Sequence, residues 1–354
     1  MKKLLITLGL LSAMFLGLPT LADEPVNNDV TQQKAIEILP TMSSESSASN
    51  RIWVGTFQIV WNEVMDNIVY GPINFVKYNS KTAKILNKQS FKKENISANS
   101  YYTKYGIVSP KLKTAIENGI KEKFNETSDI LDLFDWTYQP DKLFIYAMLK
   151  KDFKFLQPFD KLAEGGFGKN STPVQYFGIN EDSDKKLAKN VNVLFHNTNT
   201  DFAVKLLTKD KDIVMLYRTD DDKTFSEYFE DLNKKSKKYT GTKAFKKDDA
   251  LRVPDINLYQ ETSFPELEGR EIRRTNFRID KTIETVDFRM NNEGVKLKSE
   301  AAIMMKCMAM PVRTGRDFLF TDNFVLFLIE KGQKTPYYAM RVTDVETLNK
   351  TGRK

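Results

Sequence analysis

Cysteine and histidine, two residue types that support covalent catalysis, occur once each in this chain, as Cys307 and His196. A thiol beside an imidazole is a pair used in acyl transfer, so a Cys–His site is arithmetically available. His196 lies in VLFHNTNTDF, at the end of an expected strand, and Cys307 lies in a methionine-rich stretch without the signature of an oxyanion hole or a helix N-terminus. Nothing in the sequence brings the two side chains together, so we do not expect this pair to act.

The other motifs that support catalysis, cofactor binding or metal binding are missing or incomplete. The chain contains no HExxH, CxxC, GxSxG or GxxxxGK[ST]. Residues 165–168 (GGFG) are glycine-rich but lack the Lys-Ser/Thr of a phosphate-binding loop, and residues 219–222 (TDDD) lack the glycine and distal glutamate of a calcium loop. We therefore predict a protein that is not an enzyme, with no catalytic residue, no cofactor and no metal.

The elements that would position any functional residue change in type along the chain. Spaced apolar residues predict helices over 51–65, 111–124 and 127–134, and residues 67–70 are typical of a short strand. After about residue 140, runs of β-branched and aromatic residues, broken by one helix over 225–233, predict strands at 143–149, 173–178, 191–196, 202–207, 213–217, 251–259, 282–290, 318–320, 324–330 and 337–342. Helices first and strands later predict an α+β domain with a mostly antiparallel or mixed sheet.

The first 22 residues predict export. Lys2 and Lys3 precede an apolar run over residues 4–18, and small residues stand at both positions that determine cleavage in Thr20-Leu21-Ala22. We expect a signal peptide over 1–22, cleaved after Ala22, and a secreted or periplasmic protein. An uncleaved anchor is the alternative, disfavoured because the run is shorter than the roughly 18 residues of a membrane span.

The rest of the chain predicts a polar leader followed by one domain. Residues 23–50 are rich in serine and asparagine, which favours a flexible leader. No repeat or low-complexity linker follows residue 50, so we expect a single domain over 51–354. One cysteine excludes an intrachain disulfide, so a large hydrophobic core must stabilise the fold. No other segment is apolar enough for a membrane span, so we expect none in the mature chain.

The charge of the chain gives no sign of a nucleic-acid partner. Removing residues 1–22 lowers the formal net charge from +7 to +5, because they contain two lysines and no acid. Both signs of charge are spread along the sequence, which supports solubility rather than nucleic-acid binding. Lysine clusters such as residues 234–238 predict solvated faces.

Several segments, taken in order, resemble one known family. These are FQIVWNEVMDNIVYGPINF (57–75), LQPFD (156–160), residues 201–232, residues 251–272 and the closing FLFTDNFVLFLIEKGQKTPYYAMRV (318–342). Together they are similar, over about residues 57–342, to the serpins, the serine protease inhibitor family, as a remote, bacterial-type member. The resemblance implies an α+β fold with N-terminal helices, a large central mixed β-sheet, smaller sheets and an exposed reactive-centre-like loop. It places 143–149, 282–290 and the region after Gly294 in one large sheet, and 324–342 in a buried hairpin.

The segment EGVKLKSEAAIMMKCMAMPVRTGR, just before that hairpin, occupies the place of the family's reactive-centre loop, about residues 295–317. The resemblance implies a hinge that could enter a packed sheet, formed by Ser299, Glu300, Ala301 and Ala302, in which the serine and the two alanines are small. It also implies a scissile region formed by Met310, Pro311, Val312, Arg313 and Thr314. Arg313 would suit a trypsin-like protease, whereas Met310 or Val312 would suit a chymotrypsin- or elastase-like one.

The resemblance therefore implies a monomeric, suicide-type inhibitor whose partner is a serine or cysteine protease. The bulky Ile303, Met304 and Met305 depart from a typical hinge, and Lys298 stands where the family commonly has glycine. These departures leave open an alternative, a non-inhibitory binding or structural protein of the same fold. A hydrolase that uses Cys307 is the third and weakest hypothesis.

Overall fold

The computed structural model of the chain describes residues 35–296 and 315–352. The expected signal peptide and the first part of the expected leader lie outside these residues, as does the whole region 297–314. One part of the leader prediction is wrong. Residues 36–38 form a strand, β1, that pairs in parallel with β2, and Leu39 is buried, because this apolar segment completes the edge of a sheet.

The largest sheet has seven strands in the order β1-β2-β19-β18-β10-β9-β8. Only β1 and β2 are parallel, so the sheet is mixed, as expected. Its strands are β1 Ile36–Ile38, β2 Asn50–Val54, β8 Val191–Thr198, β9 Asp201–Leu207, β10 Asp212–Arg218, β18 Phe324–Glu330 and β19 Tyr338–Val342. The expected hairpin of β18 and β19 is confirmed: every residue of both strands is buried, including Phe324 and Phe327. A strand covered on both faces favours a continuous apolar run, here FVLFLI over residues 324–329, rather than alternation.

Smaller sheets complete the β-structure. One contains β17 Asp317–Leu319, β11 Ala250–Pro254, β7 Thr172–Ile179 and β6 Asp160–Phe167; another contains β12 Ile256–Thr262, β15 Glu284–Met290, β16 Gly294–Lys296 and β5 Asp152–Lys154. Two-stranded sheets are formed by β13 Arg270–Glu271 with β14 Arg278–Ile279, and by β3 Tyr101–Val108 with β4 Gln139–Leu149. With the helices below, these sheets give the α+β fold that the sequence predicts.

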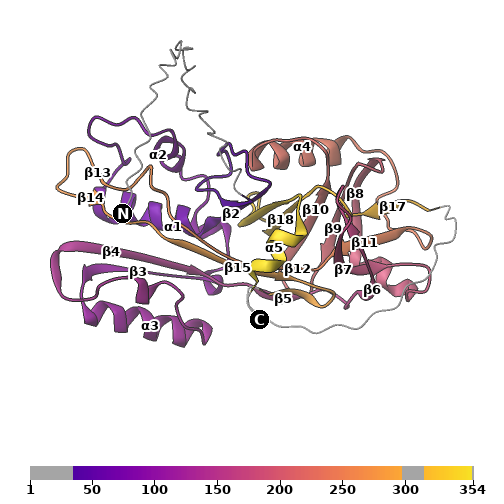
Figure 1. The fold of residues 1–354 in the computed structure, drawn as a ribbon, viewed down its shortest axis with the longest axis horizontal. Helices are drawn as coiled ribbons and strands as arrows, with labels where there is room; N and C mark the ends of the chain where they lie inside the picture. The colour runs from indigo at the N-terminus through magenta and orange to yellow at the C-terminus, as the bar shows by residue number, and fades with distance from the viewer. Residues whose placement is uncertain (1–34, 297–314, 353–354) are drawn as a thin grey trace, which may run out of the picture. The chain divides into compact units, whose positions relative to one another are not determined.

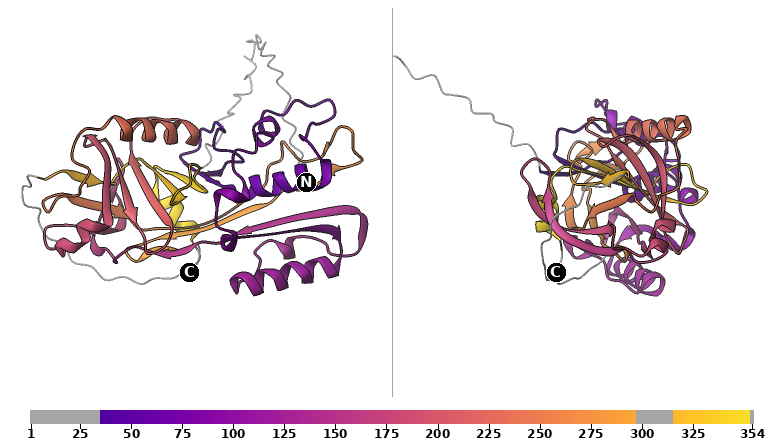
Figure 2. Two further views of the ribbon diagram at one scale, coloured as in Figure 1. Left: turned by 180° about the vertical axis from the view of Figure 1, so that it is seen from behind. Right: turned by 90° about the vertical axis from the view of Figure 1, so that its right-hand side faces the viewer.

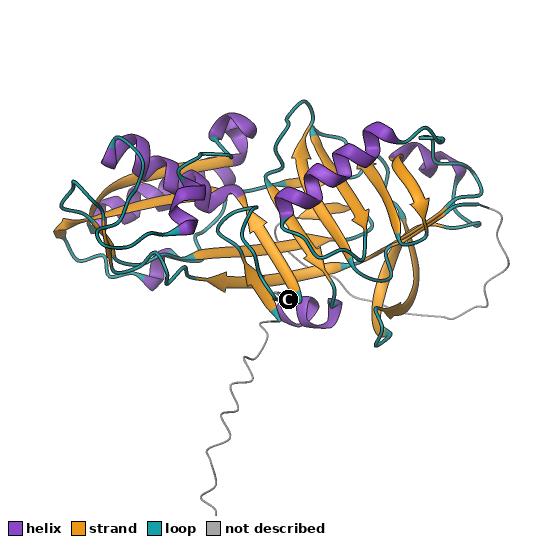
Figure 3. Ribbon diagram, turned by 90° about the horizontal axis from the view of Figure 1, so that it is seen from above, coloured by secondary structure: helices purple, strands orange, loops and turns teal. Residues whose placement is uncertain are grey.

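The described residues include five α-helices. The α-helices are α1 Gly55–Val64, α2 Lys81–Leu86, α3 Pro110–Phe124, α4 Phe225–Lys238 and α5 Val345–Thr351; short 3₁₀ turns cover Lys93–Asn95, Ala98–Ser100, Leu131–Leu133 and Lys185–Asn190. In Figures 1 and 2, α3 packs against the β3–β4 hairpin. Figure 3 shows α4 lying across strands of the seven-stranded sheet, where Phe225 and Phe229 contact Phe327. No helix among the described residues is long and apolar enough to cross a membrane.

Three local predictions are wrong. The helix expected from residue 51 begins at Gly55, because residues 51–54 pair with β19 as part of β2. Residues 67–70 do not form a strand, since Met65–Val69 is a π-helical turn that extends α1. The helix expected over 127–134 is reduced to a single 3₁₀ turn, in which Ser128 accepts hydrogen bonds from the backbone of Ile130 and Leu131.

The expectation that 143–149 and 282–290 share one large sheet is also wrong. Within the described residues, β4 pairs with β3 alone, whereas β15 pairs with β12 and, at its end, with β16. The two strands are kept apart because β16 lies between β15 and β5, the strand that follows β4 after two residues. A cavity lies between these two strands.

Candidate functional site

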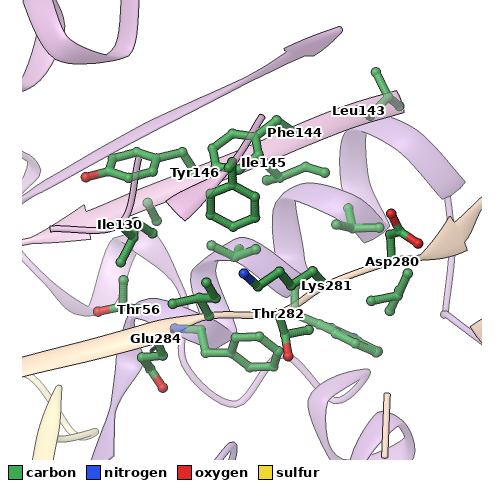
Figure 4. A pocket seen from close by; sticks show the side chains of 18 of the residues that line it. Thr56, Ile130, Leu143, Phe144, Ile145, Tyr146, Asp280, Lys281, Thr282 and Glu284 are labelled. Carbon is green, nitrogen blue, oxygen red and sulfur yellow. Dashed lines mark hydrogen bonds between the residues drawn. The ribbon is translucent and has the colours of Figure 1, made fainter. Parts of the chain in front are cut away.

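A cavity of about 1080 Å³ separates β4 from β15, with α1 as its third wall. Figure 4 shows residues 143–146 of β4 on one side of the space, and Asp280, Lys281, Thr282 and Glu284 on the other. Further apolar side chains come from α1 and from the segment between α3 and β4, namely Phe57, Val60, Trp61, Val64, Ile130, Leu133 and Phe134. The cavity is therefore bounded by elements from the first half of the chain on two sides and by β15 on the third.

β16 lies between β15 and β5 in the sheet and holds them one strand apart. On one side Val295 pairs with Met290 of β15, and on the other side Val295 pairs with Phe153 of β5. Neighbouring strands lie about 4.8 Å apart, so β15 and β5 are held about 10 Å apart, with one strand between them. Val295 is fully buried, which fixes the inward face of this three-strand arrangement.

Beyond β16 the two facing strand edges have no strand partner in the described part of the chain. The edge of β15 over residues 284–288 is unpaired on the cavity side, and so is the edge of β4 that points away from β3. An unpaired strand edge exposes backbone N–H and C=O groups that can pair with another strand. The cavity therefore has two unpaired strand edges, which one additional strand would need as hydrogen-bonding partners.

The side chains of β4 divide between its two faces. Tyr146, Phe144 and Met148 pack with α3 in a small core of their own, together with Ile116 and Ile120. Successive side chains on a strand point to opposite faces, so residues 143, 145 and 147 lie on the other face, and Ala147 packs against the main core. β4 thus lies between the small core and the main core, and side chains from both of its faces line the cavity.

Glu284, the first residue of β15, is the buried acid of this cavity. It is 5% exposed, and its Oε1 accepts a hydrogen bond from the backbone N–H of Phe57 at 3.2 Å. Phe57 is the third residue of α1, so the carboxyl group takes up one of the free N–H groups at the start of that helix. Its Oε2 is buried without a hydrogen-bond partner. Burial raises the pKa of Glu284 to about 8, against the lowering effect of the Phe57 N–H.

Most other polar groups on the cavity wall have partners. Lys150 forms an ion pair with Glu126 at 2.8 Å, and Lys142 forms one with Asp280 at 3.4 Å. The hydroxyl of Thr282 donates to Glu268 at 2.8 Å and accepts from the backbone N–H of Phe264 at 2.7 Å. Lys281, in contrast, is exposed and places its Nζ 5.0 Å from the centre of the Phe134 ring.

The predicted hinge and scissile residues all lie outside the described residues: Ser299, Glu300, Ala301, Ala302, Met310, Pro311, Val312, Arg313 and Thr314. The structure does define the two ends of that segment. It begins directly after β16, and it ends at Gly315 and Arg316. Arg316 forms an ion pair with the buried Asp249 at 2.6 Å and donates to the backbone oxygens of Thr242 and Ala244.

His196 has a packing role. Its ring stacks on Phe202 at 5.7 Å and meets Phe318 edge-on at 5.0 Å. Cys307 lies outside the described residues, so no geometry supports the Cys–His pair. Among the described residues, no group of three or more His, Cys, Asp or Glu side chains could hold a metal ion.

The chain was compared with protein-family models, with curated proteins and with solved structures, and only the solved structures include similar proteins. No protein-family model matches it, and no curated protein matches it. Similar solved structures include Serpin48 of the insect Tenebrio molitor, at 13% identity and a TM-score of 0.46, covering 82% of this chain and 96% of that one. Human thyroxine-binding globulin complexed with its hormone is similar at 10% identity and a TM-score of 0.47, covering 84% and 92%. A second structure of thyroxine-binding globulin with thyroxine has 10% identity and a TM-score of 0.41, covering 71% and 78%.

Proposed function

We propose that this chain is an exported, serpin-like protein that traps a serine or cysteine protease by inserting its cleaved segment 297–314 between β4 and β15. The observation that supports the proposal is the position of β16. It already stands as a middle strand between β15 and β5, and segment 297–314 follows it directly in the sequence. Continuing the same strand would fill the space between two unpaired edges.

The register of β16 fixes how such a strand would lie. Val295 is opposite Met290 and Lys296 is opposite Arg289, so continuation of that antiparallel pairing would set Ser299 opposite Val286 and Ala301 opposite Glu284. The small Ser299 and Ala301 would then face the core between β4 and β15. Small side chains at these positions would let the strand enter without displacing the packed wall.

The same register accounts for Lys298. Side chains alternate along a strand, and Val295 faces the core, so Lys298 would point to the opposite face. There it would stand opposite Asp287 of β15, where unlike charges on neighbouring strands attract. The lysine at this position is therefore compatible with insertion. Ile303 and Met305 would face inward, so the cavity wall would have to make room for them.

In the proposed mechanism, a protease attacks a bond between Met310 and Thr314 and forms an acyl-enzyme. Insertion of the freed segment would form two new ladders of backbone hydrogen bonds and cover the apolar wall of the cavity. The favourable free energy of that step would carry the attached protease away from its starting position and distort it before the acyl bond is hydrolysed.

The decisive experiment mixes the purified mature protein with a panel of serine and cysteine proteases and looks for complexes that survive SDS. We expect a complex with at least one active protease and none with the same protease after its nucleophile is blocked. The substitution Ala301→Arg should convert the inhibitor into a substrate that is cut without forming a complex, because a large charged side chain cannot enter the core. If Arg313 precedes the scissile bond, Arg313→Ala should abolish complexes with trypsin-like enzymes only.

The alternative is a non-inhibitory binding protein of the same fold, and the cavity itself favours it. Ligand sites are commonly concave, mostly apolar and equipped with a few polar groups, and this cavity has all three properties. Clean cleavage of the segment by every protease in the panel, with no SDS-stable complex, would support this alternative and contradict the inhibitor.

A further inference from the structure

We propose that the cavity between β4, β15 and α1 binds an elongated apolar molecule that carries one basic amine, and that Glu284 receives the ammonium group. The proposal shares the cavity with the proposed function but does not depend on protease inhibition. It is based on the shape of the cavity, on the chemistry of its walls and on one unsatisfied buried oxygen.

The cavity is large enough for such a ligand. Its volume of about 1080 Å³ compares with roughly 300–1,000 Å³ for small-molecule sites in proteins. Part of the wall is formed by aliphatic side chains of β4 and α1, namely Leu143, Ile145, Ala147, Val60 and Val64. A flexible chain or a fused ring system would cover this apolar surface, with a favourable free energy that scales with the area removed from water.

Glu284 provides the specific polar contact. Its Oε1 is occupied by the Phe57 N–H, whereas Oε2 is buried without a hydrogen-bond partner. A buried polar atom without a partner costs about 1–3 kcal/mol, so a ligand that donates a hydrogen bond to Oε2 relieves a penalty that the unbound protein carries. An ammonium group donates such a bond and also neutralises the carboxylate.

The charges along the wall favour a basic ligand over an acidic one. Lys150 and Lys142 are already paired with Glu126 and Asp280. Lys281 forms no ion pair with another described residue, but it is exposed, and water screens its attraction for an anion. Glu284 is buried, where the effective dielectric constant is lower and an opposite charge is attracted more strongly.

Binding of an amine should release a proton. Before an amine binds, the carboxyl group holds its proton at pH 7, because burial raises the pKa of Glu284 to about 8. An ammonium ion then replaces that proton: the carboxyl O–H bond breaks, the proton goes to water, and a carboxylate–ammonium pair remains. The two buried tyrosines of the wall stay neutral throughout, because burial raises the pKa of Tyr146 to about 12 and that of Tyr338 well above 10.

The test compares three probes of equal chain length, decylamine, decanol and decanoate, by isothermal titration calorimetry below their micelle concentrations. We expect decylamine to bind at least about tenfold more tightly than decanol at pH 8, a difference of about 1.4 kcal/mol, and decanoate to bind weakest. Titration at pH 7 in two buffers of different ionisation enthalpy should show release of up to one proton with decylamine and none with decanol. Decylamine affinity should rise from pH 6 to pH 8.

Variants separate the carboxyl group from the apolar wall. Glu284→Gln keeps the acceptor for the Phe57 N–H, so it should fold, bind decanol as before and lose the preference for decylamine. Glu122→Gln, an exposed acid on α3, is the matched control and should change nothing. Ala147→Phe should weaken all three probes, because its ring would occupy the cavity.

Equal affinity for decylamine and decanol, or an unchanged preference in Glu284→Gln, would overturn the assignment of Glu284. Absence of binding by all three probes would overturn the site altogether. The outcome is distinguishable from that of the protease experiment. Amine binding without protease complexes contradicts only the inhibitor, whereas protease complexes without amine binding contradict only the ligand site.

Discussion

At the scale of single residues, the burial of Glu284 beside the cavity lowers the stability of the folded protein. A carboxyl group is seldom fully buried without a charged partner, because it must remain protonated or lose the solvation of its charge. Here the Phe57 N–H at the start of α1 satisfies one oxygen only. The stability of the protein should therefore depend on the protonation of this side chain.

The first prediction concerns pH. The pKa of Glu284 is about 8 in the folded protein, against an ordinary value of 4.5, so the folded state binds more protons than the unfolded state between these pH values. The contribution of this group to stability is then fully present below pH 4.5 and is lost as pH rises toward 8. With about 1.4 kcal/mol for each unit of pKa, the loss is up to about 5 kcal/mol. Urea unfolding of the wild type and of Glu284→Gln at pH 4.5, 6 and 8 measures it.

In these titrations Glu284→Gln should be the more stable protein at pH 8, and the difference should shrink toward pH 4.5. Glu122→Gln, on the exposed face of α3, should follow the wild type at every pH. Parallel curves for the wild type and Glu284→Gln across this range would contradict the raised pKa.

The signal for Glu284 was present in the sequence but was not recognised there. In ETVDFRM, the alternation of a strand sets Glu284 on the same face as Val286, Phe288 and Met290, all of which are buried. A single acid on the inward face of a strand is a candidate functional group. Its position at the start of α1 could not be predicted, because Phe57 is more than two hundred residues away in the chain.

At the scale of elements, a buried charge network joins β4 and β5 to the seven-stranded sheet. Lys151 lies in the two-residue connection between them and forms ion pairs with Asp212 at 2.9 Å and with Glu330. Ser97 donates to Glu330 through its backbone N–H at 2.9 Å and its hydroxyl at 2.7 Å. Burial alone would raise the pKa of Glu330, but the hydrogen bonds from Lys151 and Ser97 hold it below its usual value.

The second prediction is that Lys151→Met destabilises the protein by about 3–5 kcal/mol, because two carboxylates would remain buried without their cation. Lys154→Met, an exposed lysine on β5 three residues later, is the control and should change stability by less than about 0.5 kcal/mol. Equilibrium urea unfolding at pH 7 measures both. Similar free energies of unfolding for the two variants would show that the charge network of Lys151 does not stabilise the contact between the β4–β5 connection and the seven-stranded sheet.

The third prediction follows from the gap between β4 and β15. Limited trypsin treatment should cut first at Lys306 or Arg313, and insertion of the cut segment should raise the melting temperature by at least about 5 °C. Arg316, which sequence reasoning alone would add as a cleavage site, should be protected by its contacts with Asp249. Differential scanning calorimetry before and after cleavage measures the change.

In Ala147→Phe the same cut should leave the melting temperature nearly unchanged, since the entering strand would meet the new ring. An increase of equal size in this variant would contradict insertion between β4 and β15. No preferential cutting within 297–314 would remove the support for a reactive loop.

At the scale of the whole molecule, export is the prediction that the described residues do not test. The apolar run over residues 4–18 and the small residues before Asp23 predict that mature protein from the native host begins at Asp23, or within a residue or two. Mass spectrometry of the mature N-terminus measures this. Recovery of residues 1–18 in the mature chain would contradict the signal peptide.

The sequence alone determined the α+β class and many of the strands after residue 140, because local periodicity and composition encode these features. The buried β18–β19 hairpin was implied by the resemblance of several segments to a known family. Local periodicity misplaced the start of α1, since the apolar spacing of residues 51–54 suits a helix as well as a buried strand, and only pairing with β19 decides between them. The tertiary structure alone decided that β4 and β15 are separate, that β16 lies between β5 and β15, and that Glu284 caps α1 beside a cavity. These features depend on contacts between segments more than a hundred residues apart, and no local pattern in the chain carries that information.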